Sequence, residues 1–190
     1  MIKIQDKILE DDKKIIIAST KVIRIGNHAS QQLNIYFKKL QYDLGCTYIF
    51  YIYENLLHNK KIIYSSSWKW QNLLVGEKLI NDCPVFKAGV EGLSNGKKSI
   101  ILPWNHIHCK NSKEKDITLL RSEFNIANGI GISHTNGCFR EGIGLGADIK
   151  DNDFYQRVIS NNLIYAIMKK IRLLTLRDAK YNLISQKVLN

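Results

Sequence analysis

The sequence predicts one folded domain in which α-helices alternate with the strands of an antiparallel β-sheet. Its 190 residues, with 45% hydrophobic and 24% charged side chains, are enough for a single core. Segments with a helical spacing of apolar residues alternate with short β-branched and aromatic segments. The dipeptide Asn136-Gly137 is a strong hairpin signal, so the two segments beside it are expected to pair antiparallel.

The first clear element is an amphipathic helix. Asn27 suits its cap, Gly45 suits the position after its last turn, and large apolar residues recur between them at helical spacing: Leu33, Phe37, Leu40 and Leu44. The segment before Asn27 fits a helix or a strand equally well.

The middle of the chain alternates between strand and helix signals. Composition and spacing predict two strands, a short helix, a third strand and another helix, at residues 47–53, 61–64, 68–77, 99–102 and 112–125. A serine among residues 65–67 is expected to cap the short helix.

The hairpin supplies two further strands, at 129–135 and 138–147, joined by a type I′ turn. In the second strand Gly142, Gly144 and Gly146 fall on one face, which is almost bare backbone. A nucleotide phosphate loop needs a strand-to-helix turn, so these glycines are not expected to cradle a phosphate. We expect them to let a helix lie close, with contact to a ligand as the alternative.

That covering helix is expected to be the C-terminal one. A cap at Asp151 or Asp153 starts a single long helix that continues past Ile171 and carries several basic residues near its end.

The formal net charge of +11 fits contact with nucleic acid, with an anionic membrane surface or with an acidic partner, but also an ordinary solvated lysine-rich surface. The four cysteines lie far apart and no signal sequence opens the chain, which predicts a cytoplasmic protein with reduced thiols. No apolar run is long enough to cross a bilayer.

Catalytic and metal chemistry have little support. His106, His108 and Cys109 lie close together, but their spacing to Cys83 or Cys138 matches no common zinc pattern, so a surface loop is favoured. No local sequence marks a thiol as an activated nucleophile. We therefore expect no enzyme, no cofactor and no metal.

The aromatic residues are more informative. Trp68, Trp70 and Trp104, with Tyr51, Tyr53 and Tyr64 on the first two strands, come from segments that flank one sheet. They fit ordinary core, or an apolar pocket with indole and hydroxyl donors that binds a small molecule.

The order of these segments resembles the autoinducer-binding domain of LuxR-type quorum-sensing regulators. Four stretches carry the resemblance: the helix at 30–45 before a tyrosine-rich strand, Trp70 followed by Asn81-Asp-Cys-Pro-Val-Phe86, Ile101-Leu-Pro-Trp104, and the glycine-rich strand before Asn136-Gly137. The resemblance implies a three-layer α/β/α sandwich around a five-stranded antiparallel sheet, PAS/GAF-like in form, that binds an acyl-homoserine lactone.

By this resemblance, Trp70 donates its indole N–H to the lactone carbonyl, Trp104 closes the lactone end, and Gly129 lets the backbone pass close by. The family's aspartate, which accepts from the ligand amide, aligns with Cys83 and leaves Asp82 one residue early; its tyrosine aligns with Leu74. Loss of that carboxylate removes about 1.5 to 3 kcal/mol of binding free energy. A related apolar ligand, or none, stays open.

The resemblance runs from about Ala29 to Leu174, and we take residues 27–176 as the sensor domain, with residues 1–26 as an extension and 177–190 as a tail. A helix-turn-helix domain does not fit into that tail. The expected role is therefore signal sensing as a homodimer or as a heterodimer with a full-length regulator, with DNA contacted only indirectly. A basic nucleic-acid-associated protein and a cysteine enzyme are the alternatives.

Overall fold

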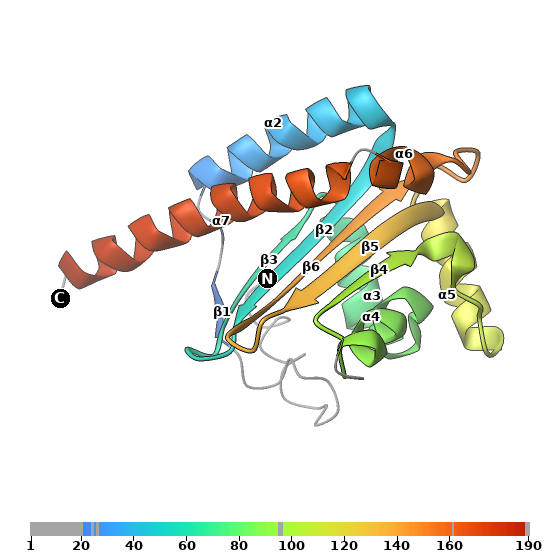
Figure 1. Cartoon of the computed structure of the whole chain (residues 1–190), viewed down its shortest axis with the longest axis horizontal. Coiled ribbons are helices and arrows are strands. Elements are labelled where there is room, and N and C mark those ends of the chain that lie inside the picture. Colours follow the sequence, from blue (N-terminus) through green and yellow to red (C-terminus); the bar gives the residue numbers. More distant parts are fainter. Residues whose placement is uncertain (1–20, 24, 26, 95–96, 161, 189–190) are drawn as a thin grey trace.

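We describe the protein from a computed structural model, which places residues 21–188 apart from 24, 26, 95–96 and 161. The expected extension at 1–26 lies mostly outside these described residues. Figure 1 shows a sheet with helices on both faces: α2, α6 and α7 lie on one face, and α3, α4 and α5 lie on the other. This three-layer α/β/α arrangement confirms the expected fold class.

The central sheet has the order β1-β3-β2-β6-β5-β4. Five of its strands pair antiparallel, as expected: β2 Cys46–Asn55, β3 Lys60–Ser65, β4 Ser99–Pro103, β5 Asn128–Thr135 and β6 Phe139–Ala147. A short edge strand, β1 Lys21–Ile23, pairs parallel with β3, in a segment for which the sequence left helix and strand open.

Local signals located most helices. Helix α2 spans Asn27–Leu44 and ends at Gly45, whose φ of 72° suits glycine. Helix α3 spans Trp68–Gly76, and the hydroxyl of its cap residue Ser67 accepts from the backbone N–H of Trp70. Helix α5 spans Ser112–Glu123. The expected starts of these helices and the end of α2 are therefore confirmed, while α3 and α5 end one and two residues earlier than expected.

One helical region was missed. A short 3-10 turn, η1 Leu79–Asp82, leads into helix α4 Pro84–Ser94, which contacts β4 and β5. Glycines such as Gly92 lower helix propensity and hid the helix in the sequence. A Cβ at Gly92 would overlap the side chain of Ile100, so the glycine is what lets α4 approach the sheet.

Two other expectations were wrong. The C-terminal helix is broken into α6 Phe154–Ser160 and α7 Leu163–Val188, with Asn162 in a left-handed conformation at φ 54°. The hairpin turn is not type I′, because only Gly137 has positive φ, at 86°. The Asn136 side chain instead accepts from the backbone N–H groups of Cys138 and Phe139, at 3.0 Å each.

Each face of the sheet has its own core. The core under α2, α6 and α7 contains Ile143 and Leu145 of β6, together with Phe154 and Ile171 of the helices. The core under α3, α4 and α5 is smaller and richer in aromatic residues. Successive side chains of a strand point into opposite cores, so an even or odd position in the strand decides which set of helices a side chain contacts.

Candidate functional site

The glycine-rich face of strands β5 and β6 points toward α3, α4 and α5. The indole of Trp104, in the 3-10 turn η2 Trp104–His106 after β4, lies over this face. A Cβ at Gly144 would be 3.3 Å from Trp104 Cζ2, and one at Gly129 would overlap the indole ring. The bare backbone therefore makes room for an aromatic side chain.

This corrects the expectation that the C-terminal helix packs on the glycines. Helix α7 lies on the opposite face, where Ile143 and Leu145 supply apolar side chains. The glycines Gly142, Gly144 and Gly146 have the other parity, so they meet the layer that contains Trp104.

Trp104 belongs to a buried aromatic cluster, which we call the tryptophan cluster. Its buried members come from strand β2, from the three helices α3, α4 and α5 or the turns beside them, and from η2. They are Tyr48, Trp70, Leu74, Ile80, Cys83, Trp104, Ile117 and Ile126. Trp70 is 2% exposed, and its ring centre lies 5.3 Å from that of Phe124. The sequence-predicted residues Trp70, Leu74, Cys83 and Trp104 thus lie in one cluster, and Gly129 adjoins it.

Asp82 and Cys83 point to different surroundings. Cys83 is buried in the tryptophan cluster, and burial raises the pKa of its thiol. The Asp82 carboxylate lies 3.5 Å from Lys87 Nζ, which also donates to Glu114 at 2.9 Å. Cys83 therefore occupies the position in the cluster that the family's aspartate was expected to have. The carboxylate of Asp82 lies outside the cluster, near Lys87.

Tyr51, Tyr53 and Tyr64 are not brought together with the tryptophans. They pack in or against the core under α2, α6 and α7, where the Tyr51 hydroxyl donates to Glu141 at 2.6 Å. Tyr48 has the opposite parity to Tyr51 and lies in the tryptophan cluster instead. The alternation of side chains along the strand separates them, because Tyr48 and Tyr51 are an odd number of residues apart.

Tyr48 supplies a neutral hydroxyl to the cluster. Burial raises its pKa well above the usual value for tyrosine, so the phenol keeps its proton. Its oxygen lies 3.4 Å from Gln71 Oε1 in α3. Tyr48 was missed from the sequence because only the later tyrosines of the strand, Tyr51 and Tyr53, were considered.

Sequence reasoning also missed Arg121 of α5. This arginine is 6% exposed, and its guanidinium carbon lies 4.8 Å from the ring centre of Trp104. Burial lowers its pKa. Arg121 Nε and Trp104 Nε1 are both buried, and neither has a hydrogen-bond partner among the described residues. The tryptophan cluster thus contains two buried donors that lack an acceptor.

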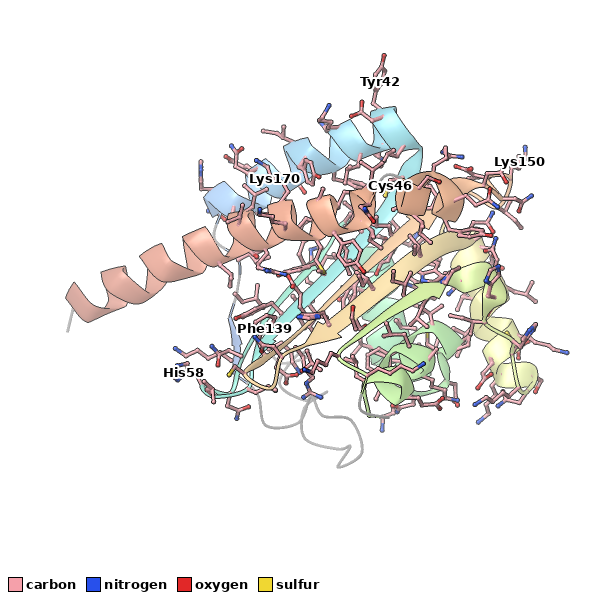
Figure 2. All side chains as sticks on the ribbon, viewed as in Figure 1. Tyr42, Cys46, His58, Phe139, Lys150 and Lys170 are labelled. Atoms are coloured by element: carbon pink, nitrogen blue, oxygen red, sulfur yellow. The ribbon has the colours of Figure 1, made fainter. Side chains whose placement is uncertain are left out.

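The other candidate chemistries gain no support. In the described part of the chain, no group of three or more His, Cys, Asp or Glu side chains is arranged to hold a metal ion, and His106 packs against Tyr155 instead. Figure 2 shows Cys46 at the start of β2, beside α6 and α7, and burial raises the pKa of its thiol to about 12. Neither buried thiol, Cys46 or Cys83, is therefore an activated nucleophile.

The basic C-terminal segment bears on the nucleic-acid alternative. Lys169 and Lys170 are exposed on α7, where Figure 2 labels Lys170. The side chains from residue 177 onward lie outside the described ones. No helix in the described part of the chain has the length and apolar character to cross a bilayer.

Solved structures with a similar fold include LuxR family proteins. CepR2 from Burkholderia cenocepacia, an N-acylhomoserine lactone dependent LuxR family transcription factor, matches over 80% of this chain and 86% of its own, with a TM-score of 0.54 and 14% identity. The fold is that of a LuxR-type autoinducer-binding domain. The ligand-binding domain of VqsR from Pseudomonas aeruginosa matches over 74% of this chain and 86% of its own, with a TM-score of 0.49 and 10% identity.

SdiA from Escherichia coli also matches, over 83% of this chain and 60% of its own, with a TM-score of 0.44 and 14% identity. No family model and no curated protein matches the chain by sequence. The LuxR-type resemblance drawn from the sequence is shown at the level of the fold by the match to CepR2.

Proposed function

We propose that this LuxR-type fold senses a small-molecule signal without catalysing a reaction, and that the signal binds at the tryptophan cluster. The observation that carries the proposal is the gathering of Trp70, Leu74, Cys83 and Trp104, from three separate segments, over a glycine-rich sheet face. An apolar site with a few buried donors is the usual form of a small-molecule site.

In this proposal the two tryptophans have different roles. Trp70 donates its indole N–H to a carbonyl of the ligand, as the family resemblance implies. Trp104 closes one end of the site, and Gly129 is required because a larger residue would displace that indole. The place of the family's aspartate belongs to Cys83, whose neutral thiol gives the ligand amide no charged acceptor.

Ligand binding is testable by thermal unfolding. Acyl-homoserine lactones with acyl chains of different lengths, at a concentration of about 100 Kd, are expected to stabilise the protein by about 2.7 kcal/mol. This corresponds to a rise in Tm of about 5 to 10 °C for a chain of this size. Trp70→Phe, which removes the indole donor, is expected to reduce the rise.

The matched control is Trp68→Phe, because Trp68 begins the same helix but is 45% exposed. It should leave the ligand-induced rise in Tm unchanged. If neither the lactones nor their ring-opened acids shift the Tm of the wild-type protein, small-molecule sensing at this cluster is rejected.

We further propose that the domain acts as a dimer, with itself or with a full-length regulator, through the outer surface of α2 and α7. Supporting this, Tyr42 of α2 projects away from the molecule in Figure 2, and Leu173 of α7 is exposed. Sedimentation velocity is expected to show a concentration-dependent dimer that Leu173→Glu weakens at least about tenfold. Ile149→Glu, at an exposed site between β6 and α6, should not weaken it. A wild-type monomer at all concentrations would reject the homodimer.

A further inference from the structure

A buried cation lacks an acceptor inside the tryptophan cluster. The Arg121 guanidinium lies over the Trp104 ring and, among the described residues, forms no ion pair. Contact with a ring face provides no acceptor for the five N–H donors of a guanidinium. One of these donors, Nε, is buried and has no hydrogen-bond partner among the described residues.

Other buried cations in this protein follow the usual rule that buried charges are paired. Lys61 is 2% exposed and lies 3.4 Å from a Glu54 carboxylate oxygen. Arg140, whose side chain is 30% exposed, also pairs with Glu54, through Nη2 at 2.8 Å. Arg121 departs from this rule.

The titratable groups near Arg121 provide no counter-charge. Those that act on its charge are Cys83, Cys109 and Tyr48. Burial raises the pKa of Cys83 and of Tyr48, so both stay neutral near pH 7. The guanidinium itself keeps its proton in proteins despite the lowered pKa. Neither of these two buried groups therefore supplies a negative charge to Arg121, and no carboxylate among the described residues forms an ion pair with it.

We propose that the signal bound at this cluster carries a carboxylate or another oxyanion, which Arg121 binds as its missing counter-ion with Trp104 Nε1 as a second donor. This inference rests on the proposed function and specifies the chemistry of its ligand. The neutral thiol of Cys83 fits the same chemistry, because a carboxylate at that position would repel an anionic group.

A matched pair of probes tests this inference. N-octanoyl-homoserine lactone and its ring-opened acid, N-octanoyl-homoserine, share the acyl chain and the amide but differ in the headgroup, which is neutral in one and a carboxylate in the other. Calorimetric titration of the full chain at pH 7 is expected to show the acid binding about ten- to a hundredfold more tightly than the lactone, the effect of one charge-assisted hydrogen bond. Homologous pairs with shorter and longer acyl chains extend the comparison.

Variants identify the residue responsible. Arg121→Gln is expected to abolish the preference for the acid. Lys115→Gln removes the same charge from an exposed position on the same helix and should preserve the preference. Cys83→Asp offers a second route, because it places a permanent carboxylate near Arg121 and should also abolish the preference while leaving Arg121 in place.

The outcomes separate the two proposals. Equal or tighter binding of the lactone by the wild-type protein overturns the oxyanion inference and leaves the sensing proposal standing. A preference for the acid that persists in a folded Arg121→Gln variant overturns it too. If Arg121→Gln does not fold by circular dichroism, an acid preference that persists in Cys83→Asp has the same effect. Failure of every lactone and every acid to bind rejects small-molecule sensing itself.

Discussion

Replacing Gly129 with alanine is expected to lower the free energy of unfolding by about 3 kcal/mol, at the upper end of what overpacking costs. The new Cβ would overlap both the backbone carbonyl oxygen of Leu145 on the neighbouring strand and the indole of Trp104. The carbonyl is fixed by the pairing of β5 with β6, so the indole or the strand must move. Urea unfolding followed by circular dichroism measures the change.

Two matched substitutions control for the loss of glycine itself. A Cβ at Gly131, two residues along the same strand face, would have its nearest neighbour 3.5 Å away, which is ordinary contact. A Cβ at Gly76, at the end of α3, meets nothing within 4 Å. Both alanine variants should lie within about 1 kcal/mol of the wild type. If Gly129→Ala is equally mild, the indole is not held tightly against the sheet.

Replacing Arg172 with methionine is expected to lower the free energy of unfolding by about 3 kcal/mol, because it strands a buried carboxylate. Arg172 of α7 forms a two-point ion pair with Glu141 of β6, through its Nε at 2.8 Å and through its Nη2. The Glu141 side chain is fully buried, and the hydroxyl of Tyr51 would be left as its donor.

The loss of stability is expected to differ between variants of the two partners, Arg172 and Glu141. Arg172 is about one-third exposed and reaches water by itself, so Glu141→Gln should cost less than Arg172→Met. Lys169→Met removes an exposed cation from the same helix and should change stability by no more than about 0.5 kcal/mol. Equal losses in Arg172→Met and Lys169→Met would mean that the ion pair contributes nothing to holding α7 on the sheet.

The location of the helices and strands depended mostly on signals that act over a few residues. Asn27 and Gly45 bounded α2, a serine capped α3, and alternation identified the hairpin strands, because capping, left-handed glycine and side-chain period are local properties. Helix α4 was missed for the opposite reason. Its glycines weaken the local signal, and contact with Ile100 on the sheet makes up for that weakness.

The candidate site was predicted only in part. Trp70, Cys83 and Trp104 came from the order of motifs along the chain, and the structure brings them together. Tyr51 was expected among them and lies on the other face, because alternate residues of β2 face opposite cores and Tyr51 faces the core under α2, α6 and α7. The site residues themselves stay predictions until ligand binding is measured.

By itself, the sequence determined most of the helices and five of the six strands of a mixed α/β fold, because periodicity, caps and turn residues specify elements and their order. Only the tertiary structure decided what covers the glycine face and which polar groups are buried. Arg121 reads in the sequence as one more charged residue on the polar side of a helix. It is a buried cation without an ion-pair partner among the described residues because α5 packs it against Trp104, and burial is a property of the packed layers rather than of local sequence.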